Sequence, residues 1–530
     1  MKKSLALVLA VVMMLSIMAG CGKTESTPTE PAPVATVPAG DLTPTVAVDE
    51  TTSYKEAITI ATTGDMPSAF VYGNSSTQTS LTTNSTHEGL VVKHPDGFAD
   101  PLLATEWTHN DDSTVWTFKL RDDVKFHNGA AFTSEDVKFT YEYCATTEND
   151  GVQWPIQGVD LIESIETPDA QTVIFNLKAA TPDWLLYAAQ KLVSKSAVEE
   201  LGGEQGGRIG TGPFMHKSQE TGVNWVIERN DNYWAELPVT KQITFVVITD
   251  ASSRALTLKS GDVDAIFDAN ASDIVNFMAD SNYNVFKAEN SANVYVGLNC
   301  ANGSICEDPI VRQAIAMSIN RDDVVNACYE NGACAVPSYN IINNVTTGYA
   351  DVDYYEYDPQ GAAKLLADNG YTNVTLNLIV FAKYKSVAEI VQADLSMAGI
   401  NVTIEEYAQS GFTSNLKKDP TKFDMYINAT SSTGGVLNIM TRYFSPTANA
   451  AAMWYEDAEF NAALEEAYKS TTYEGLVASY AGLQQHLAET VPAVPLAQTY
   501  QWCIGTKNFG GVDLGTQTYE VNFTNAYVVE

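Results

Sequence analysis

Short apolar runs rich in β-branched and aromatic residues recur along most of the chain. Alternation of apolar and polar positions predicts strands at 114–120 and 172–177, and more continuous apolar runs predict buried strands. The runs that predict strands lie at 57–62, 114–120, 172–177, 243–248, 375–380 and 422–429. Buried and half-buried strands in one chain indicate sheets that are covered to different degrees.

Amphipathic helices separate these strands. Thr133 and Asp136 have the spacing of a capping box, and Asp308 followed by Pro309 predicts a second helix start. Near the C-terminus, apolar residues spaced 4, 3 and 4 apart predict one buried stripe, made of Leu476, Tyr480, Leu483 and Leu487. Pro492 and Pro495 follow this helix and should end it. The mixture predicts an α/β protein with mixed sheets.

The first 53 residues do not fit this pattern. Lys2 and Lys3 precede a short apolar run, and the small residues Ala19 and Gly20 stand directly before Cys21. This predicts a lipoprotein signal over residues 1–21, with Cys21 as the lipid-modified residue that holds the protein to a membrane. Residues 22–53 are rich in Thr, Pro, Ala and Glu without apolar periodicity, so we expect a disordered tether.

Composition narrows the possible partners. The chain has 65 acidic and 30 basic residues and a formal charge of −35. Nucleic acid and anionic lipid are therefore poor partners. About 475 residues follow the tether, which is too many for one ordinary core, so two or three lobes are expected.

The remaining six cysteines fit an oxidising exterior. Cys300 with Cys306 and Cys328 with Cys334 each lie six residues apart, and we expect two small-loop disulfides there. Pairing cannot be derived from sequence. Cys144 and Cys503 are expected to be buried thiols.

Eight motifs in one order carry a family resemblance. They include HEGLV at 87–91, the segment WTFKLRDDVKFHNG at 116–129, IGTGPF at 209–214 and ERNDNYW at 228–234. LTLKSGDVDAIF at 256–267, DPIVRQAIAMSINRDDVV at 308–325 and YDPQGAAKLLADNGY at 357–371 follow. With the helix start at 132–137, this order resembles the extracellular solute-binding proteins of family 5, which bind peptides or nickel and serve ABC importers.

The resemblance implies a fold and a division of the chain. The fold is the periplasmic-binding-protein-like type II clam, an α/β fold with two main lobes, mixed sheets and an extra inserted lobe. Lobe I would comprise 54–86, 206–290 and 496–530, lobe II would be the insert 87–205, and lobe III would be 291–495. The hinge crossovers should lie near 288–294 and 494–500, and the lobes should close on a ligand between them.

The resemblance also implies three ligand-contacting places. They are the loop at 73–82, the loop after the strand at 422–429, and the two hinge crossings. These places are rich in Ser, Thr, Asn, Gln and aromatics, which suits a polar, adaptable cleft. The candidate ligand-binding residues are Ser76, Thr77, Gln78, Thr79, Tyr295, Asn299, Thr430, Ser431, Ser432, Arg442, Tyr500 and Trp502.

One of these loops departs from the peptide-binding pattern of the family. Peptide binders place an Asp there against the α-amino group, whereas this chain has Asn428-Ala429-Thr430-Ser431-Ser432. Arg442 could meet a ligand carboxylate or pair with a surface acid. The cargo is thus an oligopeptide held through its backbone, an oligosaccharide or a metal chelate.

Other function classes have little support in the sequence. There is no G-x-S-x-G or H-E-x-x-H motif, and the six histidines lack metal-binding spacing, so we expect neither an enzyme, a resident metal nor a cofactor. A surface sensor that uses the same cleft stays open as an alternative. The predicted partners are permease subunits, an ATPase through them, and the membrane through the lipid. The predicted location is extracytoplasmic and lipid-anchored, and the protein is expected to be a monomer.

Overall fold

The computed structural model describes residues 52–68, 70–72, 76–93, 99–146, 158–408, 412–430, 435–446, 448, 451–515 and 520–530. Cys21, the tether up to residue 51, Ser431 and Ser432 lie outside the described residues. Within the part described, no helix has both the length and the apolar character needed to cross a membrane.

The largest element is an eleven-stranded mixed sheet. Its main order is β15 (Asn401–Tyr407), β14 (Thr375–Phe381), β16 (Met425–Ala429), β12 (Tyr283–Leu298), β17 (Ala493–Thr506), β11 (Ala265–Phe267), β1 (Ala57–Thr62), β10 (Gln242–Val247), β9 (Asn224–Arg229) and β8 (Phe214–Glu220), and β13 (Ala335–Pro337) pairs with β17. β1 is parallel to β10 and β11, and β14 is parallel to β15 and β16, while the central pair β12–β17 is antiparallel. The predicted mixed α/β fold is confirmed, and the six predicted strands are all present.

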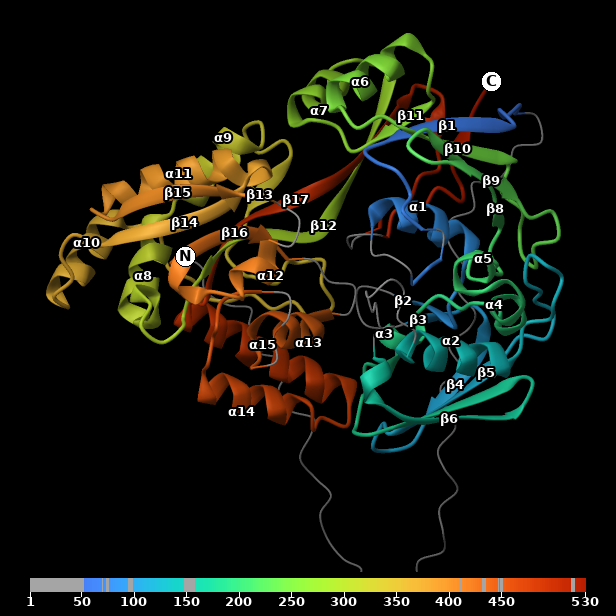
Figure 1. The fold of residues 1–530 in the computed structure, drawn as a ribbon, viewed down its shortest axis with the longest axis horizontal. Helices are drawn as coiled ribbons and strands as arrows, with labels where there is room; N and C mark the ends of the chain where they lie inside the picture. The colour runs from blue at the N-terminus through green and yellow to red at the C-terminus, as the bar shows by residue number, and fades with distance from the viewer. Residues whose placement is uncertain are drawn as a thin grey trace, which may run out of the picture. The chain divides into compact units, whose positions relative to one another are not determined.

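The two long strands in the middle join two sets of shorter strands. β12 and β17 lie side by side over most of their length, with a register shift between Glu289 and Asn293 (Figure 1). The chain enters the set that holds β13 to β16 through β12 and leaves it through β17. The register shift falls inside the first predicted hinge crossing. The predicted lobe boundaries themselves stay predictions.

A separate four-stranded antiparallel sheet occupies part of the predicted insert. Its order is β4 (Ala104–His109), β5 (Val115–Leu120), β7 (Thr172–Leu177) and β6 (Ile162–Asp169). Two small two-stranded antiparallel sheets complete the strands, β2 (Val91–Lys93) with β3 (Ala99–Pro101) and β18 (Phe509–Gly510) with β19 (Tyr527–Val528). The four-stranded sheet has its own hydrophobic cluster, which includes Trp116, Phe118 and Phe175.

The helices cover these sheets. They are α1 (Thr77–Thr86), α2 (Ser134–Thr146), α3 (Trp184–Ala188), α4 (Lys195–Leu201), α5 (Gly203–Gly206), α6 (Ala251–Ser260), α7 (Ala271–Met278), α8 (Pro309–Ser318), α9 (Arg321–Cys328), α10 (Pro359–Asp368), α11 (Lys385–Met397), α12 (Phe412–Leu416), α13 (Gly435–Ile439), α14 (Ala458–Ala467) and α15 (Tyr473–Thr490). A single π-helical turn, Met440–Phe444, follows α13. The predicted stripe on α15 is buried at all four positions.

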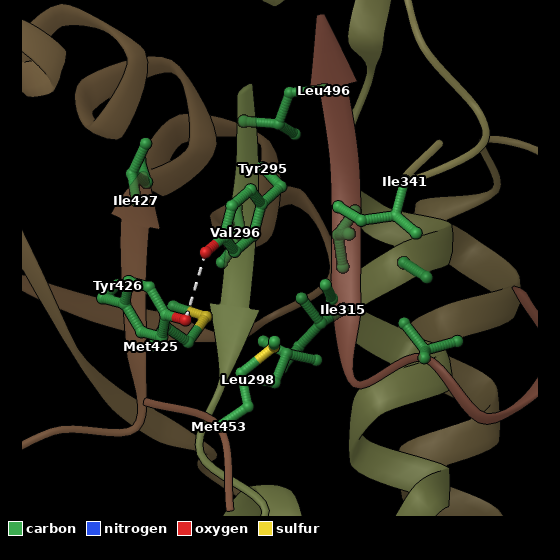
Figure 2. Packing of buried hydrophobic residues seen from close by; sticks show 14 of the residues in the cluster. Tyr295, Val296, Leu298, Ile315, Ile341, Met425, Tyr426, Ile427, Met453 and Leu496 are labelled. Carbon is green, nitrogen blue, oxygen red and sulfur yellow. Dashed lines mark hydrogen bonds between the residues drawn. The ribbon is translucent and has the colours of Figure 1, made fainter. Parts of the chain in front are cut away.

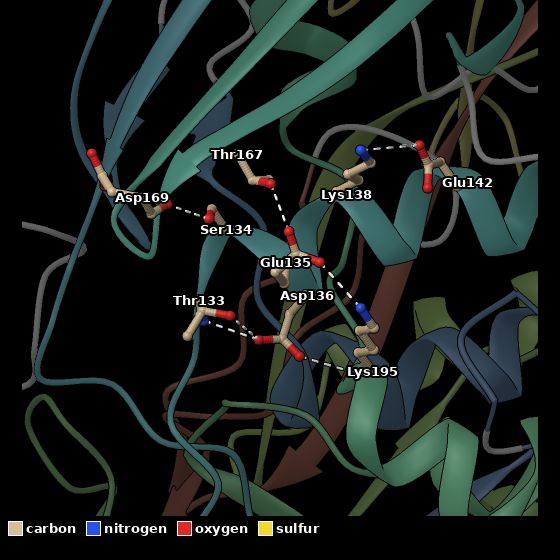
Figure 3. Close-up of polar contacts among 9 residues, drawn as sticks. All are labelled: Thr133, Ser134, Glu135, Asp136, Lys138, Glu142, Thr167, Asp169 and Lys195. Atoms are coloured by element: carbon tan, nitrogen blue, oxygen red, sulfur yellow. Dashed lines mark hydrogen bonds and ion pairs between the residues drawn. The ribbon is translucent and has the colours of Figure 1, made fainter.

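The predicted helix starts form as expected. In α8, the Asp308 side chain accepts a hydrogen bond from the Ile310 N–H at 2.8 Å. At the start of α2, Asp136 Oδ2 accepts from both the backbone N–H and the hydroxyl of Thr133, each at 2.9 Å (Figure 3). Asp136 Oδ1 also accepts from the Lys195 backbone N–H, so the cap ties α2 to α4.

The disulfide prediction is wrong for this structure. Cys300, Cys306, Cys328, Cys334 and Cys503 are all free thiols. Cys306 and Cys503 are fully buried among apolar side chains, which raises the pKa of each thiol. They fill space as small hydrophobic residues, which the spacing of cysteines alone does not reveal.

Candidate functional site

The family motifs meet in a buried cluster of polar residues around Glu88 and not in a ligand site. Glu88, from HEGLV, is nearly enclosed and accepts three hydrogen bonds. Its donors are the Tyr233 hydroxyl at 2.7 Å, the Thr211 hydroxyl at 2.7 Å and Trp234 Nε1 at 3.1 Å. Burial raises the pKa of Glu88, and the three donors oppose that rise. The Arg121 guanidinium stacks on the Trp234 ring at 4.2 Å.

A histidine, His127, fixes the same region. His127 Nε2 lies 3.0 Å from the Gly212 carbonyl, and the Gly210 N–H donates to His127 Nδ1 at 3.2 Å. A Cβ atom added at Gly210 would lie 2.0 Å from the Thr86 carbonyl oxygen, so only glycine allows this approach. Burial lowers the pKa of His127 to about 4. The ring is neutral at pH 7 and serves the scaffold.

The second predicted loop begins at the hinge. Thr430 follows β16 and makes two hydrogen bonds with the backbone of Asn293 of β12. The Thr430 N–H donates to the Asn293 carbonyl at 2.9 Å, and the Asn293 N–H donates to the side-chain Oγ1 of Thr430 at 3.1 Å. The structure therefore brings the start of this loop onto the predicted hinge crossing.

Asn293 carries an unused acceptor at that point. Its Nδ2 donates to Ser338 Oγ at 2.8 Å and to the Asn340 carbonyl at 2.6 Å, which fixes the orientation of the amide. Its Oδ1 is buried and has no hydrogen-bond partner. Sequence reasoning missed Asn293, although it lies within the predicted crossing 288–294.

Gln501 is a second missed residue of the same kind. Alternate residues of a strand face opposite sides of a sheet, and Cys503 of β17 packs in the same cluster as Leu81 of α1. Gln501 lies two residues before Cys503 and so shares its side. Gln501 is 8% exposed, and its Oε1 is buried without a partner. Alternation along the last apolar run was the signal that could have found it.

Tyr500 and Trp502 lie on the opposite side of β17. Trp502 packs with Ala255 and Leu258 of α6 and Phe277 of α7. Lys287 Nζ lies 3.4 Å from the Tyr500 ring centroid and 5.8 Å from that of Trp502. The structure therefore brings Tyr500 and Trp502 together, but it separates them from the side that α1 covers.

The first predicted loop leads into α1. Ser76 caps this helix, since its Oγ accepts from the Thr79 N–H at 3.1 Å. Gln78 Nε2 donates to Thr63 Oγ1 at 2.8 Å, and the buried Thr79 hydroxyl donates to the Ser68 carbonyl at 2.9 Å. Thr77 is half-buried. This leaves Ser76 and Thr77 with accessible surface, while Thr79 already has an internal partner.

Two other predicted residues are core residues. Tyr295 is 0% exposed, and its hydroxyl lies 3.3 Å from the Tyr426 hydroxyl among apolar side chains (Figure 2). Asn299 is also 0% exposed and donates through Nδ2 to the Pro420 and Phe423 carbonyls at 2.6 and 2.8 Å. Both are enclosed and, unlike Asn293, leave no buried acceptor without a partner, so we leave both out of the proposed site.

Arg442 lies in the π-helical turn after α13 and is half-buried. No ion pair of Arg442 is found among the described residues, so the predicted pairing with a surface acid is not seen there. The described residues contain no group of three or more His, Cys, Asp or Glu side chains placed to hold a metal ion.

Comparison with known proteins places the chain in a family. The model of "Bacterial extracellular solute-binding proteins, family 5 Middle" matches residues 99–451. The nickel-binding periplasmic protein of Escherichia coli K12 is 29% identical over 345 residues, which cover 60% of this chain and 65% of that protein. Di/tripeptide-binding protein 2 of Pseudomonas aeruginosa is 25% identical over 451 residues, covering 78% of this chain and 83% of that protein.

A solved structure gives the same result for the fold. The periplasmic binding protein DppA of Helicobacter pylori, in complex with the peptide STSA, superposes with a TM-score of 0.77 at 23% identity, covering 90% of this chain and 99% of the other. The chain spans a little under two thirds of the first curated relatives that it matches. The predicted clam-type fold is thus confirmed, and the chain belongs to the family 5 bacterial extracellular solute-binding proteins.

Proposed function

We propose that this protein captures a small solute outside the cell and delivers it, chemically unchanged, to the permease of an ABC importer. Family membership supports this proposal, and the matched relatives are named for binding nickel and di- or tripeptides. The motif residues support it as well, because Glu88 and His127 are engaged in the scaffold and are not free for catalysis.

The observation that carries the proposal is the paired hinge strand. β12 and β17 connect the two sets of strands, and their register shift at Glu289–Asn293 interrupts the ladder between them. Two strands that bend at one point allow two bodies to rotate toward each other and enclose a ligand. The permease then distinguishes the closed, loaded form from the open one.

The chemistry at the hinge favours a cargo with hydrogen-bond donors. Asn293 Oδ1 and Gln501 Oε1 are buried acceptors without partners. A buried acceptor left unpaired costs about 1–3 kcal/mol, which a donor from the ligand would offset. Peptide N–H groups are such donors, so oligopeptides are the proposed cargo. The other proposed contacts come from the start of α1, from the loop after β16 and from the π-helical turn after α13. They are Ser76, which caps α1, Thr77, Thr430, Ser431, Ser432 and Arg442.

A metal chelate is the second candidate, favoured by the Escherichia coli relative. Because the described residues offer no cluster of metal-binding side chains, a metal would travel inside a small organic chelator.

Membrane attachment through Cys21 is part of the proposal. The small residues before Cys21 and the short apolar run support it. Cys21→Ala should release the protein into the medium or leave it held by an uncleaved signal. Acylation and retention equal to the parent protein would contradict this.

The decisive experiment is native mass spectrometry of the protein made without its first 21 residues and purified without refolding. The expected result is a mixture of peptide masses that disappears after denaturation. Gln501→Leu should lose most of this cargo, whereas Trp502→Leu, on the other side of β17, should keep it. A single chelate mass would favour the second candidate, and no retained or added peptide, chelate or sugar would refute solute capture.

A further inference from the structure

Asp183 occupies an unusual position for a carboxylate. It precedes α3 at the N-cap position, yet its side chain makes no capping hydrogen bond. It is 2% exposed, and both Oδ1 and Oδ2 are buried with no hydrogen bond of good geometry, although the Tyr480 hydroxyl of α15 interacts with the carboxylate. An ionised carboxylate in such a place is costly, because it loses water and gains no cation in return.

The surroundings of Asp183 come from two different parts of the chain. One part is the four-stranded sheet with α3, within the predicted insert. The other is the segment around α13 to α15, which the chain reaches through the hinge strand β12. The Ser113 hydroxyl donates to the Thr471 carbonyl at 2.9 Å across this contact. A Cβ added at Gly435 of α13 would lie 3.3 Å from Leu186 Cδ1 of α3.

The titratable groups that face Asp183 are phenols. Burial raises the pKa of Asp183, and a hydrogen bond from the Tyr480 hydroxyl of α15 opposes that rise; Tyr187 of α3 lies close enough for Asp183 to raise its pKa. Tyr468 after α14 and the carboxylate of Asp160 act in turn on Tyr187. No cation is among the groups that shift Asp183. Within this contact the Tyr480 hydroxyl offsets part of a negative charge on Asp183, but burial outweighs it.

We propose that Asp183 is a proton-dependent latch between the two bodies that the hinge joins: closing the contact favours the uptake of a proton by Asp183. This rests on the proposed closure about β12 and β17, and it adds a regulation of that closure by pH. When the contact opens, water reaches the carboxylate and its ordinary acidity returns.

The direction of the effect follows from linkage. Burial raises the pKa of Asp183 to about 6, from an ordinary value of 3.8. The closed form thus binds more protons than the open form between these values, so closure is favoured as the pH falls. From pH 7 to pH 5 the closed-to-open ratio should rise about tenfold.

Cross-linking of the protein without any solute tests the latch. Asp160→Cys and Lys469→Cys place two exposed thiols on opposite sides of the contact, since Asp160 lies near enough to influence Tyr468. A short bis-maleimide links them faster when the contact is closed. Rates are compared at equal pH between this background and the same background with Asp183→Asn, so that the pH dependence of thiol reactivity cancels.

The expected result is faster linking with Asp183→Asn, by about a hundredfold at pH 7.5 and about tenfold at pH 5. Asp183→Ser should act in the same direction, which guards against an effect of the Asn amide. Asp394→Asn is the matched control: burial raises the pKa of Asp394 to about 6 as well, but Asp394 lies on α11, away from the contact.

Equal linking rates with and without Asp183 at both pH values would overturn the latch, as would a pH-dependent change of the same size with Asp394→Asn. Solute capture is tested separately, by the cargo in the mass spectrum. Failure of the latch would therefore leave the proposed function intact, and failure of capture would not alter the linking ratio.

Discussion

The buried polar cluster around Glu88 predicts a large loss of stability on Glu88→Ala. Three donors point at this carboxylate from segments 123 to 146 residues away in sequence. Removing the carboxylate leaves Thr211, Tyr233 and Trp234 without their acceptor. Each unpaired buried donor costs about 1–3 kcal/mol. Because the hydroxyls of Thr211 and Tyr233 can rotate toward other acceptors, we expect about 3–5 kcal/mol in total.

Thermal unfolding of the ligand-free protein measures this effect. For bodies of 150–250 residues, 1 kcal/mol corresponds to about 2–4 °C, so the transition of this region should fall by about 10 °C. Glu88→Gln should lose less than half as much, since its oxygen can still accept from Thr211 and Trp234 while its amide donates to the Tyr233 hydroxyl.

An exposed carboxylate with two partners provides the control. Glu135 accepts from the Thr167 hydroxyl and pairs with Lys195 at the surface (Figure 3). Glu135→Ala should change the free energy of unfolding by at most about 1 kcal/mol. A difference of about 2 °C corresponds to about 1 kcal/mol. If the unfolding temperatures of Glu88→Ala and Glu135→Ala differed by less than about 2 °C, the polar cluster around Glu88 would not stabilise the fold as argued.

Four further outcomes are expected. His127→Asn should flatten the loss of stability that the parent protein shows below pH 6.5. Because folded His127 has a pKa of about 4, the unfolded chain binds this proton first as the pH is lowered, and the free energy of unfolding of the parent should fall by about 2 kcal/mol from pH 7 to pH 5. Acid titration followed by circular dichroism measures this. Asn299→Ala should cost about 2–4 kcal/mol in urea unfolding, because the buried Phe423 carbonyl and the partly buried Pro420 carbonyl lose their donor. Gln501→Leu should weaken binding of a retained peptide about tenfold in calorimetry, and an unchanged affinity would remove Gln501 from the site. N-acetylated and free-amine forms of that peptide should bind within about threefold of each other, and a larger preference for the amine would reveal an acidic anchor.

Local features of this fold could be predicted from the sequence, because they depend on neighbours in the chain. The capping residues Asp136 and Asp308 and the buried stripe of α15 need only the spacing of residues along one helix. The order of the family motifs predicted the family correctly. Whether Cys300 and Cys306 form a bond depends on how the segment between them folds, and spacing alone gave the wrong result.

The site was harder to predict, because the side of a strand on which a residue lies depends on the whole sheet. Tyr500 and Trp502 were predicted to contact a ligand, which stays a prediction, and the structure packs them in the cluster of α6 and α7. The residue between them, Gln501, faces the other side with an unused acceptor. A polar residue between two aromatics in a long apolar run was visible in the sequence. Its meaning required the position of Cys503 against the cluster of α1.

The unused polar groups fall into two kinds with opposite consequences. Asn293 and Gln501 are neutral amides at the hinge strands, and a donor from a bound solute would satisfy them at any pH. Asp183 is ionisable and lies in the contact away from the hinge strands, where burial disfavours its charge and a proton removes that charge. If both act on closure, solute and proton stabilise the same closed form through different groups. Each then increases the affinity for the other, because two ligands that favour one state are linked reciprocally. A protein of this kind would hold its cargo more tightly in mildly acidic surroundings and release it more readily at neutral pH.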